Sequence, residues 1–199
     1  MPNLILASSS SYRKSLLERL HIPFKCISPD LDEQAQENES AEHQAIRLAK
    51  EKAQAVAQQF PEATVIGSDQ VAELCFVGST AKSSRVLGKP GNHQRAVEQL
   101  SIQSGQLVKF YTAVTVLEQG LLSSALDITE VQFRDLSSAE IEAYLKADTP
   151  YNCAGSFKAE SLGVSLFESV KSDDPTALIG LPLIKLSKLL RDLNIPASE

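Results

Sequence analysis

Residues 4 to 20 read LILASSSSYRKSLLERL, a short apolar run that leads directly into four serines and then a basic stretch. The apolar run predicts a buried strand over residues 3 to 7. Leu16, Leu17 and Leu20 predict a following helix with one apolar face. A strand that is apolar throughout is typical of parallel sheets whose two faces are both covered. This stretch therefore favours an α/β fold.

The rest of the chain extends this pattern with alternating strands and helices. Ser40 is placed to cap one helix, and Ser137 with Glu140 forms the pattern of a capping box before another. Gln119 and Gly120 separate two long strand-like runs and predict a hairpin. We expect a single domain over residues 1–199, with a mixed central sheet flanked by helices and two lobes around a cleft. Strands are expected at 22–29, 63–74, 106–118, 121–136 and 163–170, helices at 41–58, 92–102, 137–147 and 181–193, and an irregular segment at 75–92.

Composition narrows the class of protein. Of the 199 residues, 43% are hydrophobic and 22% are charged, which is usual for a globular protein. No apolar run is long enough to cross a membrane, and the first residues do not resemble a signal peptide. Three widely spaced cysteines fit free thiols in a reducing compartment better than disulfides. We expect a cytoplasmic protein without a membrane partner, and the net charge of −6 argues against a stable nucleic-acid partner.

The serine-rich turn and Arg13 suggest an anion site. Arg13 is expected in or near the first turn of the first helix, where the helix dipole disfavours a cation. An anion bound to the free backbone N–H groups would offset that effect, and serine hydroxyls would add donors. The alternative is that Ser8 to Ser11 only cap the helix and Arg13 is solvated.

Two charged residues interrupt apolar patterns. Lys52 shares a helical stripe with Ala45, Ala49 and Val56, so its ammonium either extends to water or points toward a bound phosphate. Asp69 lies on the apolar face of a predicted strand, where a carboxylate needs a partner, a loop to cap, or a metal. Asp32 and Glu33 follow another strand and are able to join Asp69 around a hard divalent ion. Lys89, in the sequence GKP, is a further candidate cation.

These segments together resemble the Maf-like nucleoside triphosphate pyrophosphatases over nearly the whole chain. The resemblance is carried by ASSSSYR, SPDLDE, RLAKEKA, IGSDQV, GKP, CAGSFKAE and IGLPL, in that order. It implies a Maf/ITPase-like fold around a nucleotide-binding cleft. It also implies that Asp69, Lys52 and Glu33 are catalytic, that Ser8, Ser10, Arg13 and Lys89 bind the substrate, and that Glu33 and Asp69 hold Mg²⁺ or Mn²⁺. Lys82 and Arg85 remain alternatives to Lys89.

Three positions resemble the 7-methyl-GTP pyrophosphatase branch of that family: Tyr12, Gln70 and Glu160. An aromatic ring at Tyr12 is able to stack on the cationic methylated base, and Glu160 supplies an opposite charge. The expected reaction is hydrolysis of 7-methyl-GTP to 7-methyl-GMP and diphosphate, a house-cleaning activity on modified nucleotides. The alternatives are a dTTP/UTP pyrophosphatase of the same family, or a nucleotide-sensing protein that inhibits septum formation without turnover. A homodimer is compatible with each of these three functions.

Overall fold

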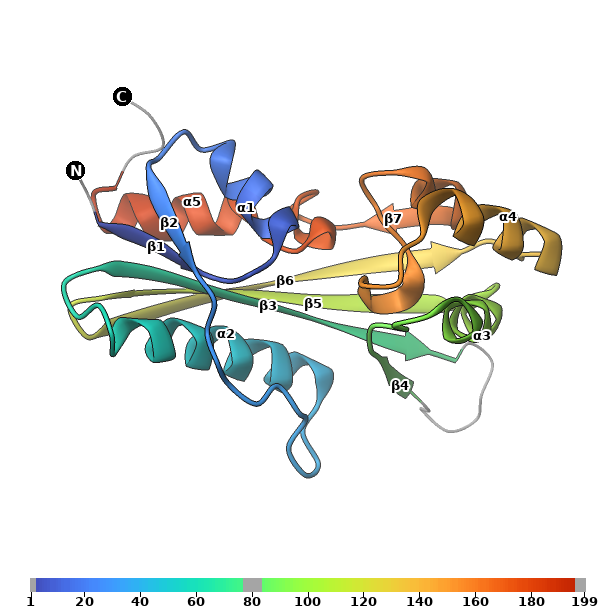
Figure 1. The fold of residues 1–199 in the computed structure, drawn as a ribbon, viewed down its shortest axis with the longest axis horizontal. Coiled ribbons are helices and arrows are strands. Elements are labelled where there is room, and N and C mark those ends of the chain that lie inside the picture. The colour runs from blue at the N-terminus through green and yellow to red at the C-terminus, as the bar shows by residue number, and fades with distance from the viewer. Residues whose placement is uncertain (1–2, 77–83, 196–199) are drawn as a thin grey trace. The chain divides into compact units, whose positions relative to one another are not determined.

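The structure, a computed structural model, describes residues 3–76 and 84–195. Within them the strands form one seven-stranded sheet in the order β2-β1-β3-β5-β6-β7, with β4 paired to β3 (Figure 1). The expected mixed sheet is confirmed, because β1 is parallel to β2 and β3, whereas β4 and β7 pair antiparallel to their neighbours. The strands are β1 Leu4–Ala7, β2 Phe24–Ile27, β3 Thr64–Cys75, β4 Ser84–Leu87, β5 Leu107–Glu118, β6 Leu121–Phe133 and β7 Phe167–Lys171.

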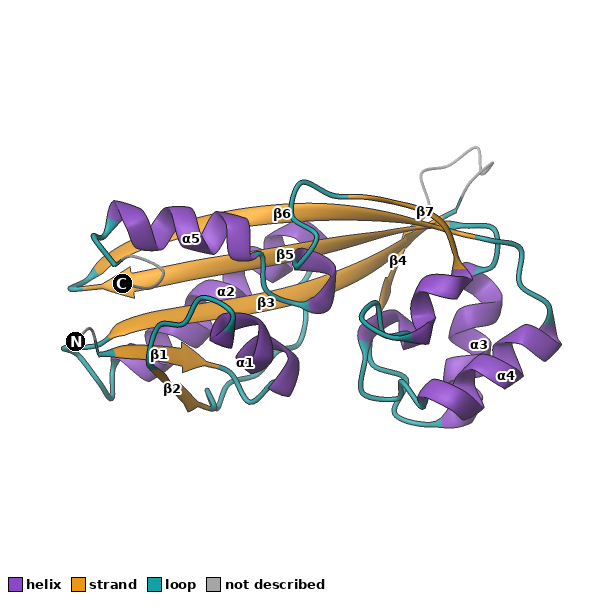
Figure 2. Cartoon of the chain, turned by 90° about the horizontal axis from the view of Figure 1, so that it is seen from above, coloured by secondary structure: helices purple, strands orange, loops and turns teal. Residues whose placement is uncertain are grey.

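Helices cover this sheet, as expected from the sequence (Figure 2). They are α1 Ser11–Glu18, α2 Ala41–Ala57, α3 His93–Gln103, α4 Ser138–Asp148 and α5 Leu183–Asp192, with short 3₁₀ turns η1 Ala154–Ser156, η2 Leu162–Leu166 and η3 Ala177–Ile179. The chain divides into two compact units. The first comprises Met1–Gln70, Tyr111–Asp127 and Asp174–Glu199, and the second comprises Val71–Phe110 and Ile128–Asp173. The expected nucleotide-binding cleft stays a prediction.

In the first unit, β1 is buried on both faces. Leu4 and Leu6 pack with α1 and α5, whereas Ile5 and Ala7 pack with α2. Successive strand residues point to opposite faces, so the unbroken apolar run LILA serves two separate cores. The opening stretch of the chain therefore forms the strand and helix that its pattern predicts.

Helix α2 approaches β3 unusually closely at Gly67. A side-chain Cβ built on Gly67 would lie 2.7 Å from the Ala53 backbone nitrogen and would collide with the Ala49 carbonyl oxygen. Only glycine permits this approach. The backbone of α2 therefore contacts the backbone of β3 at Gly67 with no side chain between them.

In the second unit, α3 and α4 pack together and a cluster of phenylalanines forms edge-to-face contacts. Phe157 lies at its centre, with ring centroids 4.9 Å from Phe167 and 5.4 Å from Phe110. The predicted capping box is present at the start of α4: Ser137 Oγ accepts from the Glu140 N–H, and Glu140 accepts from the Ser137 N–H. These contacts give the second unit an ordered core of its own.

Two expectations for strands need correction. The segment 75–92, expected to be irregular, contains β4, whose Leu87 pairs with Ala72 of β3. The strand expected at 163–170 begins only at Phe167, because residues 162–166 form η2. Gly163 explains the turn: a Cβ there would collide with the Lys158 carbonyl, so the chain folds tightly against itself at this point.

The hairpin is confirmed, with positive φ at Gln119 and Gly120.

Candidate functional site

The Lys52 ammonium lies at the centre of the candidate site. Its Nζ is 2.6 Å from Asp69 Oδ1 and 2.7 Å from Glu33 Oε1, and the lysine as a whole is only 4% exposed. Extension of this side chain to water, one of the two sequence-based interpretations, is therefore wrong. An ammonium this deeply buried needs opposite charges beside it, and the two carboxylates supply them.

The three members of this cluster come from different kinds of structure. Lys52 lies on α2 and Asp69 on β3, and the Gly67 contact fixes these two elements against each other. Glu33 lies in the loop between β2 and α2, and its side chain is 54% exposed. The buried Lys52–Asp69 pair thus meets solvent on the side of Glu33. A ligand is able to reach the charged cluster from that side.

Asp32, the neighbour of Glu33, has a different role. Its Oδ1 accepts a hydrogen bond from the Gln34 N–H at 3.0 Å, which makes an Asx turn in the loop. Of these two neighbouring acidic residues, Glu33 therefore joins the Lys52 cluster, whereas Asp32 stabilises the turn of the loop.

The serine-rich turn caps α1 as its sequence suggests. Ser10 Oγ accepts from the Arg13 N–H at 3.4 Å, and Ser8 Oγ accepts from the Ser10 N–H at 3.1 Å. Arg13 lies in the first turn of α1, as predicted, but it is half-buried rather than freely solvated. Its Nε donates to the Gly180 carbonyl at 2.9 Å, which holds the guanidinium near the helix N-terminus. A cation held at the positive end of a helix dipole is an arrangement that suits a phosphate.

The segment that follows β7 holds both Arg13 and Gln70. Gln70 Nε2 lies 2.9 Å from the Ala177 carbonyl, 3.1 Å from the Leu178 carbonyl and 3.0 Å from Thr112 Oγ1. These three acceptors fix the orientation of the amide group. The Gly180 carbonyl of the same segment accepts from Arg13. Two residues predicted for substrate binding and specificity are thus held by one segment of the chain.

A buried aspartate that is not among the residues predicted for the site shapes this segment. Asp174 is fully buried, and its Oδ2 accepts from the Ile184 N–H of α5 at 2.6 Å. Its Oδ1 lies 2.6 Å from Thr176 Oγ1, which in turn accepts from the Leu183 N–H at 2.9 Å. No local capping pattern could have identified it, because α5 begins only at Leu183 and Asp174 reaches that helix through the fold of the chain.

The remaining predicted residues are distributed between the units. Tyr12, in the first unit, is half-buried beside Arg13 on α1. Lys89 and Glu160 belong to the second unit, and each is exposed there. Arg85 is exposed on β4, and Lys82 falls outside the described residues. The structure thus gathers Glu33, Lys52 and Asp69, and links Arg13 with Gln70 through a shared segment.

The carboxylates offer a limited set of ligands for a divalent cation. Among residues 3–76 and 84–195, no group of three or more His, Cys, Asp or Glu side chains gathers as a metal site. Glu33 and Asp69 nevertheless converge on one point, now taken by Lys52 Nζ. Mg²⁺ is commonly held by one or two carboxylates together with phosphate oxygens and waters. The pair therefore fits a metal that arrives with a phosphorylated substrate, rather than a closed protein cage.

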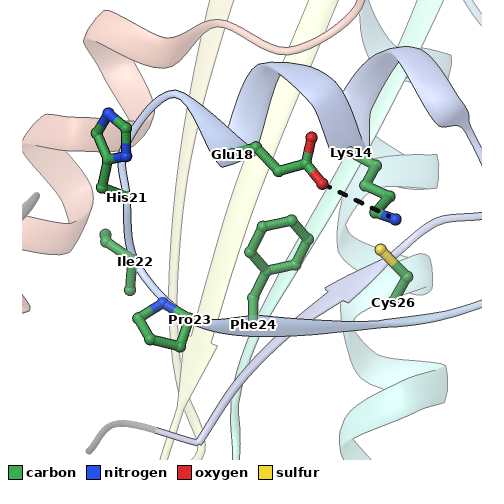
Figure 3. A pocket seen from close by; sticks show the side chains of 7 residues that line it. All are labelled: Lys14, Glu18, His21, Ile22, Pro23, Phe24 and Cys26. Atoms are coloured by element: carbon green, nitrogen blue, oxygen red, sulfur yellow. Dashed lines mark ion pairs between the residues drawn. The ribbon is translucent and has the colours of Figure 1, made fainter.

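A separate pocket of about 430 Å³ lies between α1 and β2 (Figure 3). Lys14 and Glu18 form an ion pair at its edge, with Nζ and Oε1 3.8 Å apart, and Cys26 contributes a thiol. Burial raises the pKa of the Cys26 thiol, so the nucleophilic thiolate is disfavoured. This pocket is lined by none of the residues predicted for the site.

In the described part of the chain, none of the helices combines the length and hydropathy that a membrane crossing requires.

Comparison with known proteins identifies the family. A family profile described as "Maf-like protein" matches residues 3–193. The 7-methyl-GTP pyrophosphatase of Xanthomonas axonopodis pv. citri is 53% identical over 191 residues, which cover 96% of both chains. The 7-methyl-GTP pyrophosphatase of Albidiferax ferrireducens is 52% identical, over 96% of this chain and 94% of its own. Among solved structures, a HAM1 protein from Coxiella burnetii is 13% identical with a TM-score of 0.48, over 96% of this chain and all of that chain.

The family profile spans all the segments on which the resemblance in sequence rests, from the serine-rich turn to IGLPL. The relatives match at about half of all positions over nearly their whole length. The chain therefore belongs to the Maf-like protein family.

Proposed function

We propose that this protein hydrolyses the α–β phosphoanhydride of 7-methyl-GTP to give 7-methyl-GMP and diphosphate. In this reaction a water oxygen bonds to the α-phosphorus, and the bond from that phosphorus to the bridging oxygen breaks. The observation that carries the proposal is the Lys52 ammonium held between Asp69 and Glu33, open to solvent on the side of Glu33. The naming of the 53% and 52% identical relatives as 7-methyl-GTP pyrophosphatases supports the choice of reaction and substrate.

Asp69 is the proposed general base. Its Oδ1 binds Lys52, and its second oxygen, Oδ2, is proposed to accept a proton from the attacking water. Lys52 keeps the carboxylate in place and stabilises negative charge on the phosphate as the anhydride breaks. Glu33 and Asp69 would hold a divalent cation, Mg²⁺ or Mn²⁺, which supplies a Lewis acid for phosphate oxygens and lowers the pKa of bound water.

The phosphates are proposed to lie against the N-terminus of α1. Arg13 is held there through Gly180, and Ser8 and Ser10 shape the turn that precedes the helix. Lys89 is a further proposed phosphate-binding cation, as the resemblance in sequence implies, with Arg85 and Lys82 as the alternatives. These groups would orient the triphosphate and offset its charge.

Base recognition is assigned to Tyr12, Gln70 and Glu160. The Tyr12 ring is able to stack on the cationic 7-methylguanine, an interaction commonly worth about 0.5–2 kcal/mol. Because the two N–H groups of the Gln70 amide face Thr112 Oγ1 and two carbonyls, its oxygen is the atom proposed to meet a base. Glu160, which is exposed, offers an acceptor of opposite charge to the methylated base.

Diphosphate release from 7-methyl-GTP, GTP, dTTP and UTP, with Mg²⁺ and with Mn²⁺, tests the proposal. We expect the highest kcat/KM for 7-methyl-GTP and a fall of about 10²–10⁴-fold in kcat for Asp69→Asn. Asp192→Asn, at an exposed position of α5, is the matched control and should keep full activity. Full activity in Asp69→Asn would refute the catalytic assignment.

Two other outcomes would replace the proposal with a different function. Preference for dTTP or UTP would assign the protein to the other branch of the family and leave the reaction type intact. Tight binding of 7-methyl-GTP without diphosphate release in the presence of Mn²⁺ would favour a nucleotide-sensing protein. A cytoplasmic location, a house-cleaning role and a homodimer stay predictions.

A further inference from the structure

The loop that carries Glu33 is not held in place by secondary structure or by burial of its own residues. Residues 32–38 are all exposed, and they form neither helix nor strand. Yet Glu33 Oε1 lies 2.7 Å from Lys52 Nζ, the end of a buried side chain of α2. An exposed loop is able to keep a carboxylate at such a position only if other contacts fix its backbone.

Arg47 of α2 supplies most of those contacts. Its Nε and Nη2 each lie 2.7 Å from one carboxylate oxygen of Glu39, which gives a two-pronged ion pair at the end of the loop. Its Nη2 also donates to the Gln34 carbonyl at 3.0 Å. The side chains are only 18% exposed for Arg47 and 8% exposed for Glu39. A planar guanidinium suits this set of acceptors, which the point charge of a lysine could not match.

Helix α2 therefore holds Glu33 from several directions. Gln44 Nε2 donates to the carbonyl of Glu33 itself at 3.3 Å, and Arg47 donates to the carbonyl of the next residue. Lys52 binds the Glu33 side chain. Glu39 Oε2 also accepts from the Gln36 N–H at 3.0 Å. Glu39, which is bound by Arg47, therefore also holds the backbone in the middle of the loop.

The Arg47–Glu39 pair is charged at every pH at which the enzyme would act. The hydrogen bonds from Arg47 lower the pKa of Glu39 to about 2. Removal of Arg47 would leave the Glu39 side chain, which is 8% exposed, without its charged partner, and would leave the Gln34 carbonyl without its donor. The loop would then move to expose these groups, and Glu33 would move with it.

We propose that Arg47 is a positioning residue that keeps Glu33 at Lys52 and Asp69. The proposal rests on the proposed function, because it gives Glu33 a part in turnover. It predicts that the benefit of Arg47 to catalysis passes through Glu33 and disappears when the Glu33 carboxylate is absent.

A double-mutant cycle tests this dependence. Arg47→Ala is expected to lower kcat/KM for 7-methyl-GTP by about 10- to 100-fold, the usual cost of a misplaced catalytic group, and to raise the metal concentration needed for half-maximal rate. In a Glu33→Gln background the same change is expected to alter kcat/KM by less than roughly twofold. An equal loss in both backgrounds would overturn the proposal, since Arg47 would then act on stability or on another group.

Glu51→Gln is the matched control on the same arginine. It removes the pair between Arg47 Nη1 and Glu51 Oε2, 2.9 Å apart, and leaves the contacts to the loop. Its kcat/KM should remain within roughly twofold of the wild type, because an ion pair between residues one helical turn apart, here Arg47 and Glu51, contributes little. A loss as large as that of Arg47→Ala would overturn the assignment. Arg47→Lys, which retains the charge, gives an intermediate loss and serves as the test variant if Arg47→Ala does not fold.

Hydrogen exchange supplies a measurement that needs no turnover. In Arg47→Ala, without substrate or metal, the Gln36 and Glu39 amides should exchange faster than in the wild type, whereas amides in the middle of α2 should not change. Unchanged exchange at these two amides would overturn the proposal. If the wild type releases no diphosphate from any nucleotide, the proposed function fails, and this measurement alone then decides whether Arg47 holds the loop.

Discussion

Gly67 determines how Lys52 reaches Asp69. The two charged residues lie on different elements, and Lys52 Nζ is 2.6 Å from Asp69 Oδ1 beside the place where α2 packs closely on β3. Gly67 is two residues before Asp69 and therefore on the same side of the strand. Since any Cβ at Gly67 would overlap the backbone of α2, the absent side chain is what permits the ion pair to form.

Gly67→Ala is therefore expected to destabilise the protein by about 1–3 kcal/mol, the usual cost of overfilling a packed site. Urea unfolding measures this change. Gly88→Ala is the matched control, because a Cβ at Gly88 would have no atom of residues 3–76 or 84–195 within 4 Å. Equal stability of the two variants would contradict the close packing of α2 on β3.

The pKa of Glu39 gives a second prediction for a single residue. Its folded pKa of about 2 lies below the ordinary 4.5, so the unfolded chain binds more protons between these values. The stability from the Arg47 pair is therefore complete above pH 4.5 and is lost as the pH falls toward 2. An NMR titration of the Glu39 carboxyl should have its midpoint near pH 2 in the wild type and should move toward 4.5 in Arg47→Ala. A wild-type midpoint near 4.5 would show that the pair does not form.

Only some of the site could be predicted from the sequence. Lys52 and Asp69 were found because each places a charge on an otherwise apolar face, and the structure pairs them. Arg47 breaks no pattern: it lies on the polar side of α2, and its main partner is eight residues away in a loop. Its role depends on how that loop folds back on the helix, which composition and periodicity do not encode.

At the scale of elements, the segment from Asp174 to Leu183 is held by polar contacts to one hydroxyl. Thr176 Oγ1 lies 2.6 Å from Asp174 Oδ1 and 2.9 Å from the Leu181 carbonyl, and it accepts from the Leu183 N–H. The same segment presents the Gly180 carbonyl to Arg13. Its geometry therefore influences the position of the guanidinium.

Thr176→Val, which keeps the shape and removes the hydroxyl, should cost about 1–2 kcal/mol of unfolding free energy. The KM for 7-methyl-GTP should rise as well, because Gly180 no longer holds Arg13 as firmly. Thr176→Ser retains the hydroxyl and should remain close to the wild type in both measurements. If valine and serine give the same KM, the segment does not control Arg13.

At the scale of the whole molecule, three strands contribute residues to both compact units. The divisions fall after Gln70 in β3, after Phe110 in β5 and after Asp127 in β6. A strand interior is a poor place for one part of a chain to unfold while the other stays folded, because ladder hydrogen bonds would be broken. We expect the two units to unfold together.

Tryptophan reporters test this expectation, since the chain has no tryptophan of its own. Phe60, in the first unit, and Phe76, in the second, are 38% and 40% exposed, so each tolerates a larger ring. Urea unfolding of Phe60→Trp and Phe76→Trp, followed by fluorescence and by circular dichroism, should give one common midpoint. Separate midpoints for the two reporters would contradict the expectation.

The sequence predicted most of the fold, because strands buried on both faces and a two-residue hairpin turn have strong local signals. It did not predict β4, whose residues are largely exposed and owe their conformation to pairing with β3. It also placed the start of β7 too early, since the contact between Gly163 and the Lys158 backbone depends on tertiary structure. Local sequence patterns identify elements that have a buried face. They do not identify an exposed strand whose conformation depends on pairing with a neighbouring strand.

The close packing at Gly67 also limits how this family member could change. Because α2 contacts β3 directly at Gly67, no substitution by a smaller residue can bring them closer, and any larger residue overlaps the helix backbone. The distance between the backbones that carry Lys52 and Asp69 therefore cannot be changed in small steps. Glu33 depends on a loop held by charge, and substitutions in that loop are able to shift it by small amounts. Of the three charges in the cluster, Glu33 is therefore the one through which mutation could adjust the reaction gradually.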